Sequence, residues 1–197
     1  MNVRLGNGEM LVVKPAEEGY LQSYIELVRQ LSKDGESYIL VNYSGKVPSL
    51  EDTRQRASAW NRSDVTMHFA TKAEDVVGYC GQRIGPSYGA ELQPHLSEMW
   101  YAVSKDYRGT GLVYALMDES IRSRNVKYIQ AYVDARNVRS MKLLERIGFR
   151  MLARLEENIL DKKSGMLADY CFFRGAVDEI LPHISRRISE KGISVLR

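Results

Sequence analysis

The chain has 197 residues, of which 44% are hydrophobic and 27% are charged. These fractions are typical of a globular domain with a substantial core, and they exclude a largely disordered or fibrous protein. The formal net charge of +3 is too small to indicate nucleic-acid binding by itself. No apolar run approaches the roughly 18 residues needed to span a membrane. The first residues lack an apolar signal core, so we expect a cytoplasmic protein.

The cysteines and histidines give no sign of a metal site. Cys80 and Cys171 each lie in an apolar run, as expected for buried, reduced thiols. The three histidines, His68, His95 and His183, are far apart and form no ligand pattern with the cysteines. We therefore expect no metal.

The first half of the chain is expected to contain strands and two helices. A strand covers residues 10–14, and apolar residues at helical spacing predict a helix within 16–33. Ser49 is placed as the N-cap of a short second helix. Two apolar runs, 65–71 and 76–84, flank a polar turn and are predicted to form a hairpin.

The second half alternates between strands and helices. The predicted order is strand, helix, strand, helix, over residues 98–103, 111–123, 128–133 and 138–147. Gly148 is placed to end the last of these helices. A final hairpin is predicted over 149–158 and 166–173. Such alternation implies parallel neighbours in the middle of a mixed sheet.

We expect one domain over residues 1–173 and a C-terminal helical extension over 174–197. The extension carries apolar residues on one helical face: Val177, Ile180, Leu181, Ile184 and Ile188. This face must pack either on the domain or on a second subunit, and the second alternative would give a homodimer.

A basic, glycine-bearing loop follows the strand that ends at Val103. Its sequence is Arg108-Gly109-Thr110-Gly111. The N-terminus of the following helix exposes unpaired N–H groups, and glycines let an anion approach the backbone closely. The loop is neither a Walker loop nor a dinucleotide fingerprint. Alone it is equally compatible with an ordinary strand-helix connection.

A second helix-opening segment starts at Asn137, with Ser140 three residues later. An N-cap role suits Asn137, since its side-chain oxygen can accept from the backbone N–H of Ser140. Its amide could instead face a ligand between the two parallel strands.

Together, these segments resemble the GCN5-related N-acetyltransferase (GNAT) family. The family's first signature, Arg/Gln-x-x-Gly-x-Gly/Ala, is matched from Arg108 to Val113. The second signature is matched by Asn137, Ser140, Leu143, Glu145, Arg146, Gly148 and Phe149. The expected order of elements agrees from about residue 10 to residue 173.

The resemblance implies an α/β (α+β) fold: a mixed, mostly antiparallel sheet of about seven strands, splayed centrally and flanked by about four helices. Acetyl-CoA is implied as the co-substrate in the V-shaped gap. The residues implied to bind it are Tyr101, Ala102, Val103, Arg108, Gly109, Thr110, Gly111, Leu112, Val113, Asn137 and Ser140. Some of Arg139, Lys142 and Arg146 are expected near the adenosine 3′-phosphate.

Two positions depart from the family pattern. Val113 replaces the small residue that ends the first signature, although its backbone N–H remains available. Leu144 occupies the position of the tyrosine that often protonates the leaving thiolate. The chain therefore looks most like the RimJ/RimL-type subgroup, whose members acetylate protein α-amines or small amines. In that subgroup the serine of Asn-x-x-Ser is a plausible thiolate partner, which nominates Ser140.

The remaining catalytic assignments are less specific. Glu98, at the start of the central strand, is the expected general base, directly or through water, although it could equally be a merely exposed strand residue. The backbone N–H near Val103 would polarise the thioester carbonyl. Tyr101 is either a proton relay or a core residue, and Tyr170 is a weaker candidate acid.

The resemblance implies that the acceptor is a primary amine, and the sequence does not identify it. Its pocket is expected between the loop from Tyr43 to Pro48 and the hairpin bearing Glu156 and Glu157. Two other functions compete: a CoA-thioester-binding regulatory protein without turnover, and an RNA-associated module. The chain lacks a clear aromatic-basic stacking motif, so nucleic acid is not the expected partner.

Overall fold

A computed structural model describes residues 1–34, 38, 44–61, 64–162 and 164–196. Its centre is a nine-stranded sheet in the order β7-β8-β6-β5-β4-β3-β2-β1-β9. The strands are β1 (Asn2–Arg4), β2 (Met10–Pro15), β3 (Val65–Lys72), β4 (Asp75–Ile84), β5 (Leu96–Val103), β6 (Tyr128–Asp134), β7 (Arg150–Asp161), β8 (Met166–Ala176) and β9 (Ser194–Leu196). The α-helices are α1 (Leu21–Lys33), α3 (Leu50–Ala57), α4 (Gly89–Leu92), α5 (Leu112–Arg122), α6 (Val138–Arg146) and α7 (Val177–Glu190).

The expected mixed, mostly antiparallel fold is confirmed, but the described residues form nine strands and six α-helices instead of about seven strands and about four helices with a C-terminal helix. The short strands β1 and β9 and the one-turn helix α4 were not expected. Ser49 caps α3 through a capping box with Asp52. Gly148, at φ +93°, follows the C-cap of α6 as expected. None of the helices that the structure describes is long and apolar enough to cross a membrane.

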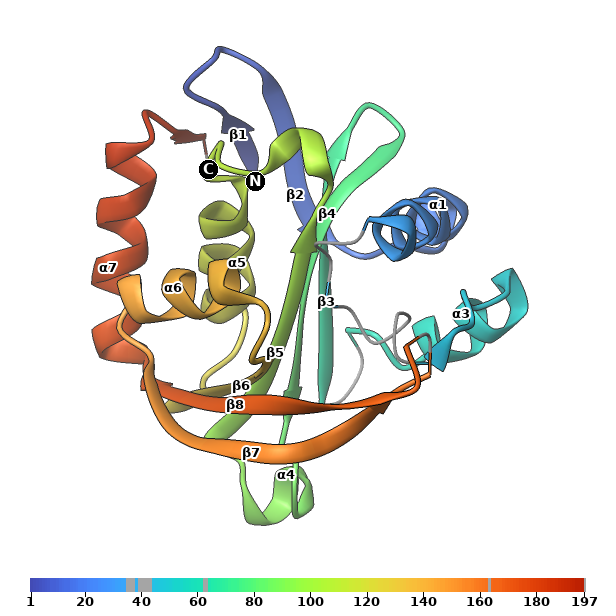
Figure 1. Ribbon diagram of the computed structural model, residues 1–197. Helices are drawn as coiled ribbons and strands as arrows, with labels where there is room; N and C mark the ends of the chain where they lie inside the picture. The colour runs from blue at the N-terminus through green and yellow to red at the C-terminus, as the bar shows by residue number, and fades with distance from the viewer. Residues whose placement is uncertain (35–37, 39–43, 62–63, 163, 197) are drawn as a thin grey trace.

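The sheet divides between β5 and β6, its only parallel neighbours in the described chain. These strands pair only from Leu96 to Glu98, opposite Tyr128 to Gln130. Beyond that point β5 stays paired with β4 as far as Val103, while β6 follows β8 as far as Asp134. In Figure 1, β6, β8 and β7 sweep away from the other strands at the bottom of the view. Within the described residues, the edge of β5 from Met99 to Val103 therefore has no strand beside it on the β6 side.

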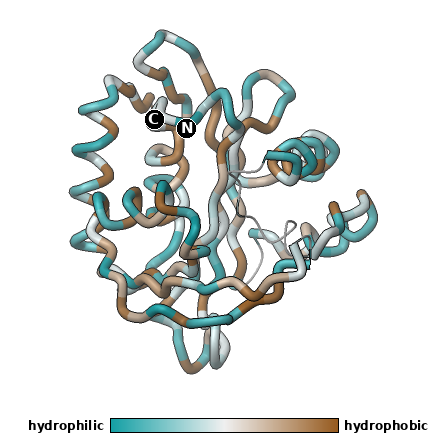
Figure 2. The backbone as a smooth tube through the Cα atoms, in the orientation of Figure 1, coloured by the Kyte–Doolittle hydropathy of each residue, from teal (hydrophilic) through white to brown (hydrophobic). Residues whose placement is uncertain are grey.

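The two faces of the sheet bury separate apolar clusters. Helices α5, α6 and α7 cover one face, where Met99, Tyr101 and Val103 of β5 join the larger cluster. Helix α1 covers the other face, where Trp100 and Ala102 join the smaller one. Figure 2 shows hydrophilic and hydrophobic segments alternating along α1 and α7, as expected for helices with one face on the protein. Successive β5 side chains therefore belong to different faces.

The C-terminal residues pack on the rest of the same chain. Ile180, Ile184 and Ile188 of α7 are buried in the larger cluster, and α7 contacts α5 and β8. Strand β9 pairs with β1, so that the two ends of the chain lie side by side (Figure 1). The apolar face of the helix is thus covered intramolecularly. The proposed homodimer stays a prediction.

Candidate functional site

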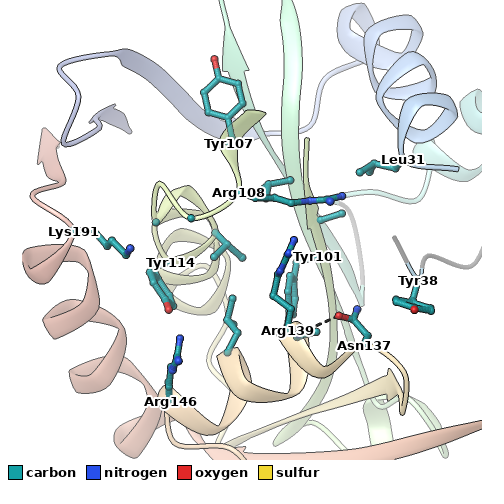
Figure 3. A pocket seen from close by; sticks show the side chains of 17 residues that line it. Leu31, Tyr38, Tyr101, Tyr107, Arg108, Tyr114, Asn137, Arg139, Arg146 and Lys191 are labelled. Carbon is teal, nitrogen blue, oxygen red and sulfur yellow. Dashed lines mark hydrogen bonds between the residues drawn. The ribbon is translucent and has the colours of Figure 1, made fainter. Parts of the chain in front are cut away.

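A cavity of about 530 Å³ lies beside the unpaired edge of β5. Tyr101, Ala102 and Val103 line it from β5, and the loop before α5 lines it together with the first turn of α5 and one side of α6 as far as Arg146. Figure 3 shows Tyr114, Arg146 and Lys191 at one end, and Leu31 and Tyr38 at the other. The splay of the sheet thus creates a pocket from residues far apart in the sequence.

The backbone of β5 presents hydrogen-bonding groups to this cavity. The N–H of Ser104 donates to the carbonyl of Val77 at 2.8 Å, on the β4 side. Because successive N–H groups of a strand point in opposite directions, the N–H groups of Val103 and Tyr101 point toward the unpaired side. An extended amide-containing ligand can pair with them as an added strand does.

The loop before α5 is shaped by two left-handed glycines. Gly109 has φ +78° and Gly111, the N-cap of α5, has φ +90°. A Cβ on Gly109 would meet no atom within 4 Å, whereas one on Gly111 would lie 2.8 Å from Ile193 and 2.9 Å from Lys191. The Thr110 hydroxyl donates to the Tyr107 carbonyl at 2.8 Å and so fixes the loop. This geometry presents a helix N-terminus to the cavity, as an anion site requires.

The expected loop residues are not equally placed. Arg108, Gly109, Gly111 and Val113 line the cavity, whereas Thr110 and Leu112 do not. Leu112 is fully buried in the core. Arg108 lines the cavity, but its guanidinium forms an ion pair with Asp34 at the end of α1. Its charge is thus directed toward α1, and a role in phosphate binding stays a prediction.

Further basic groups surround the cavity. Arg139 and Arg146 line it and Lys142 does not, and the expected proximity of some of them to the 3′-phosphate stays a prediction. Lys191 and Tyr114 also line it, and neither was expected from the sequence. Tyr114 lies in the first turn of α5, three residues after Gly111 of the loop. Its distance from that loop in the sequence could have indicated that it lines the cavity. Lys191 carries no comparable sequence signal.

Asn137, Ser140 and Tyr101 meet at the middle of the cavity. The side-chain oxygen of Asn137 accepts from the backbone N–H of Ser140 at 3.1 Å, which confirms the N-cap. The Ser140 hydroxyl lies 2.6 Å from the Tyr101 hydroxyl, and either can donate. Burial raises the pKa of Tyr101 although the bond to Ser140 opposes it, so the phenol is protonated at neutral pH. Leu144 is fully buried in the core, and its aliphatic side chain has no proton to donate to this site.

Glu98 lies apart from this pair. It shares the sheet face of Trp100, opposite the face of Tyr101, and it does not line the cavity. Burial raises the pKa of Glu98, opposed by the charge of Arg83 and by a hydrogen bond with Gln130. Gln130 is its partner in the last parallel pair before the strands diverge. Tyr170 also does not line the cavity.

Comparison with known proteins identifies the family. The model of the acetyltransferase (GNAT) family matches residues 21–149. The chain therefore belongs to this family, whose members transfer an acetyl group from acetyl-CoA. A comparison with curated protein sequences found no match.

Solved structures agree with the fold. Ribosomal-protein-alanine N-acetyltransferase from Brucella melitensis is 23% identical, with a TM-score of 0.72 over 84% of this chain and 99% of that one. A phosphinothricin acetyltransferase from Sinorhizobium meliloti in complex with AcCoA is 19% identical, with a TM-score of 0.71 over 84% and 88%. YncA, a putative acetyltransferase from Salmonella typhimurium with its cofactor acetyl-CoA, is 16% identical, with a TM-score of 0.70 over 86% and 95%. At these identities the likeness concerns the fold alone.

Proposed function

We propose that the chain transfers the acetyl group of acetyl-CoA to a primary amine by direct attack. The acceptor is either a protein N-terminal α-amine, such as that of a ribosomal protein, or a small amine. One observation carries the proposal: a single cavity joins the unpaired edge of β5, the helix N-terminus at Gly111 and the Tyr101–Ser140 pair.

The cavity suits acetyl-CoA along its whole length. The backbone from Tyr101 to Val103 would pair with the pantetheine amides, and the loop from Arg108 to Val113 would hold the pyrophosphate through its N–H groups. Of that loop, Arg108, Gly109, Gly111 and Val113 line the cavity. Arg146 would bring positive charge to the nucleotide end, and Arg139 lines the cavity nearer Tyr101 (Figure 3). Bound there, acetyl-CoA supplies a thioester carbonyl that an amine can attack. Two observations support this fit. A Cβ on Gly109 would meet no atom within 4 Å, and in the described residues β5 pairs with β6 only as far as Glu98.

Different side chains take the proton from the amine and give a proton to the leaving sulfur. Glu98 accepts the proton of the amine through water, and its raised pKa makes the carboxylate a stronger base. The N–H of Val103 donates to the carbonyl oxygen as its charge develops. As the C–N bond forms and the C–S bond breaks, Ser140 gives its proton to the departing sulfur. Tyr101 replaces that proton through the 2.6 Å contact. The proton that Glu98 took from the amine then returns to Tyr101 through water, so both groups are restored for the next cycle.

Assignment to the RimJ/RimL-type subgroup is part of the proposal. The Asn-x-x-Ser spacing supports it, together with the fold likeness to ribosomal-protein-alanine N-acetyltransferase. The acceptor would lie on the α1 side, between residues 44–48 and the β7 residues Glu156 and Glu157. Tyr43, also expected there, lies outside the described residues. We also propose that the reaction takes place in the cytoplasm and that it involves neither a metal nor nucleic acid.

Two measurements test this function in order. Acetyl-CoA should raise the unfolding temperature, and ATP and NAD should not; at about 100 times Kd the stabilisation is about 2.7 kcal/mol. CoA release should then follow addition of a suitable amine from a panel of N-terminal peptides and small amines. Absence of any shift with acetyl-CoA would contradict the proposal.

The alternative function is a regulatory protein that holds a CoA thioester without turnover. The leucine at position 144, where the family often has a proton-donating tyrosine, and the position of Glu98 outside the cavity favour it. Tight acetyl-CoA binding with no CoA release across the whole panel would support this alternative against the enzyme.

A further inference from the structure

One end of the cavity is formed by a residue outside the part of the chain that the family model matches. Lys191 is the C-cap of α7, and the match ends at residue 149. Its side chain lines the cavity beside Tyr114 and Arg146 (Figure 3). The C-terminal segment therefore forms part of the wall of the pocket.

The fold holds Lys191 firmly against the loop before α5. Its Cγ and Cβ lie 2.9 and 3.0 Å from the point that a Cβ on Gly111 would occupy. On the other side its carbonyl oxygen lies 2.6 Å from the corresponding point on Gly6. The pairing of β9 with β1 follows within a few residues. Both glycines thus leave room for Lys191, and its stem lies beside the N-cap of α5.

The charge at this end of the cavity is uncompensated in the described part of the chain. There, no carboxylate forms an ion pair with Lys191 or Arg146. The neighbouring Glu190 is directed to Arg186 and Arg187, at 2.8 and 2.6 Å. Two cations that pair with no described carboxylate, beside a helix N-terminus, suit an anionic ligand.

We propose that Lys191 binds a phosphate of CoA, so that the C-terminal segment completes the cofactor site. This inference rests on the acetyl-CoA binding proposed above. A lysine ammonium recognises phosphate as a point charge on a flexible stem. Either the pyrophosphate or the ribose 3′-phosphate can supply that group, and the two are separated by experiment.

The test is calorimetric titration of the full chain with CoA and with 3′-dephospho-CoA. Lys191→Met retains the linear stem against Gly111 and removes only the charge, so it should raise the Kd for CoA about tenfold. Lys191→Arg should restore most of the affinity. Arg186→Gln, which removes an exposed charge of the same helix outside the cavity, should leave the Kd unchanged.

The two ligands identify the phosphate. If Lys191 binds the 3′-phosphate, Lys191→Met will not weaken binding of dephospho-CoA any further. If it binds the pyrophosphate, the variant will weaken both ligands equally. In either case added salt should reduce the difference between wild type and variant.

Three results would overturn the inference. They are wild-type affinity of a folded Lys191→Met chain for both ligands, equal losses in Lys191→Met and Lys191→Arg, and a loss that salt leaves unchanged. The second and third would indicate a packing role. Should Lys191→Met not fold, Lys191→Gln takes its place. Failure of the wild type to bind CoA would refute the proposed function instead.

Discussion

The two hydroxyls at the centre of the cavity have different chemical roles. Tyr101 is buried, and burial raises its pKa. It therefore gives up its proton only to a neighbour, here Ser140, that loses its own proton in the same step. Ser140, at 2.6 Å, lies at the first turn of α6 and lines the cavity. Ser140 is therefore the group that can reach a leaving sulfur, and Tyr101 is the group that supports it.

This order predicts unequal effects of two substitutions. Ser140→Ala should lower kcat about 100-fold or more and change the KM for acetyl-CoA much less, because the proton donor is lost while the β5 edge and the loop before α5 are kept. Tyr101→Phe should lower kcat less. Steady-state CoA release measures both, with the exposed Ser185→Ala as the control. An unchanged kcat in Ser140→Ala would remove Ser140 from the mechanism.

The two glycines of the loop differ as experimental targets. A side chain at Gly111 would have to adopt a positive φ and would clash with Lys191 and Ile193. Loss of CoA binding in such a variant could therefore result from misfolding as well as from the introduced charge. Gly109 has a positive φ but open space at its Cβ, and asparagine and aspartate tolerate that conformation.

Gly109→Asp should therefore weaken CoA binding at least about tenfold, because its carboxylate would face the phosphates. Gly109→Asn has nearly the same shape without the charge and should bind severalfold more tightly than Gly109→Asp. Titration calorimetry of both variants measures the difference. Equal affinities for the two would show that the pyrophosphate does not lie at this loop.

At the scale of secondary-structure elements, α6 depends on its cap. The Asn137 side chain satisfies the N–H of Ser140, one of four that a helix leaves without an internal partner. Asn137→Ala should cost about 1 kcal/mol of unfolding free energy, and Asn137→Asp should preserve it because aspartate caps equally well. Urea denaturation measures both. Unchanged stability in Asn137→Ala would mean that the cap is dispensable.

Features that depend on local interactions were predicted from the sequence, and features that depend on distant parts of the chain were not. Helix caps, the glycines of the loop and the Asn-x-x-Ser spacing are local, so the sequence alone predicted α5, α6 and the two helix N-termini that face the cavity. Strands β1 and β9 are three residues each and exist through pairing of the chain ends, so no local pattern revealed them. Lys191 was missed for the same reason, and the ion pair of Arg108 with Asp34 is equally non-local.

At the scale of the whole molecule, the sheet both carries the site and contributes a pH-sensitive stability. His68 on β3 is 2% exposed, faces the larger cluster and has a buried Nδ1 without a hydrogen-bond partner in the described residues. Burial, followed by the charges of Arg124 and the N-terminus, lowers the pKa of His68 to about 4. An unfolded histidine titrates near 6.5.

This difference predicts how stability depends on pH. Between pH 6.5 and 4 the unfolded chain binds a proton at His68 that the folded chain does not, so the free energy of unfolding falls as the pH falls. The full loss is about 3 kcal/mol; it begins near pH 6.5 and is complete near pH 4. Urea denaturation across this range should show a steeper fall for wild type than for His68→Phe, which cannot titrate. Exposed carboxylates contribute equally to both chains and cancel in the difference. Parallel curves would therefore mean that folded His68 takes up its proton over the same pH range as in the unfolded chain.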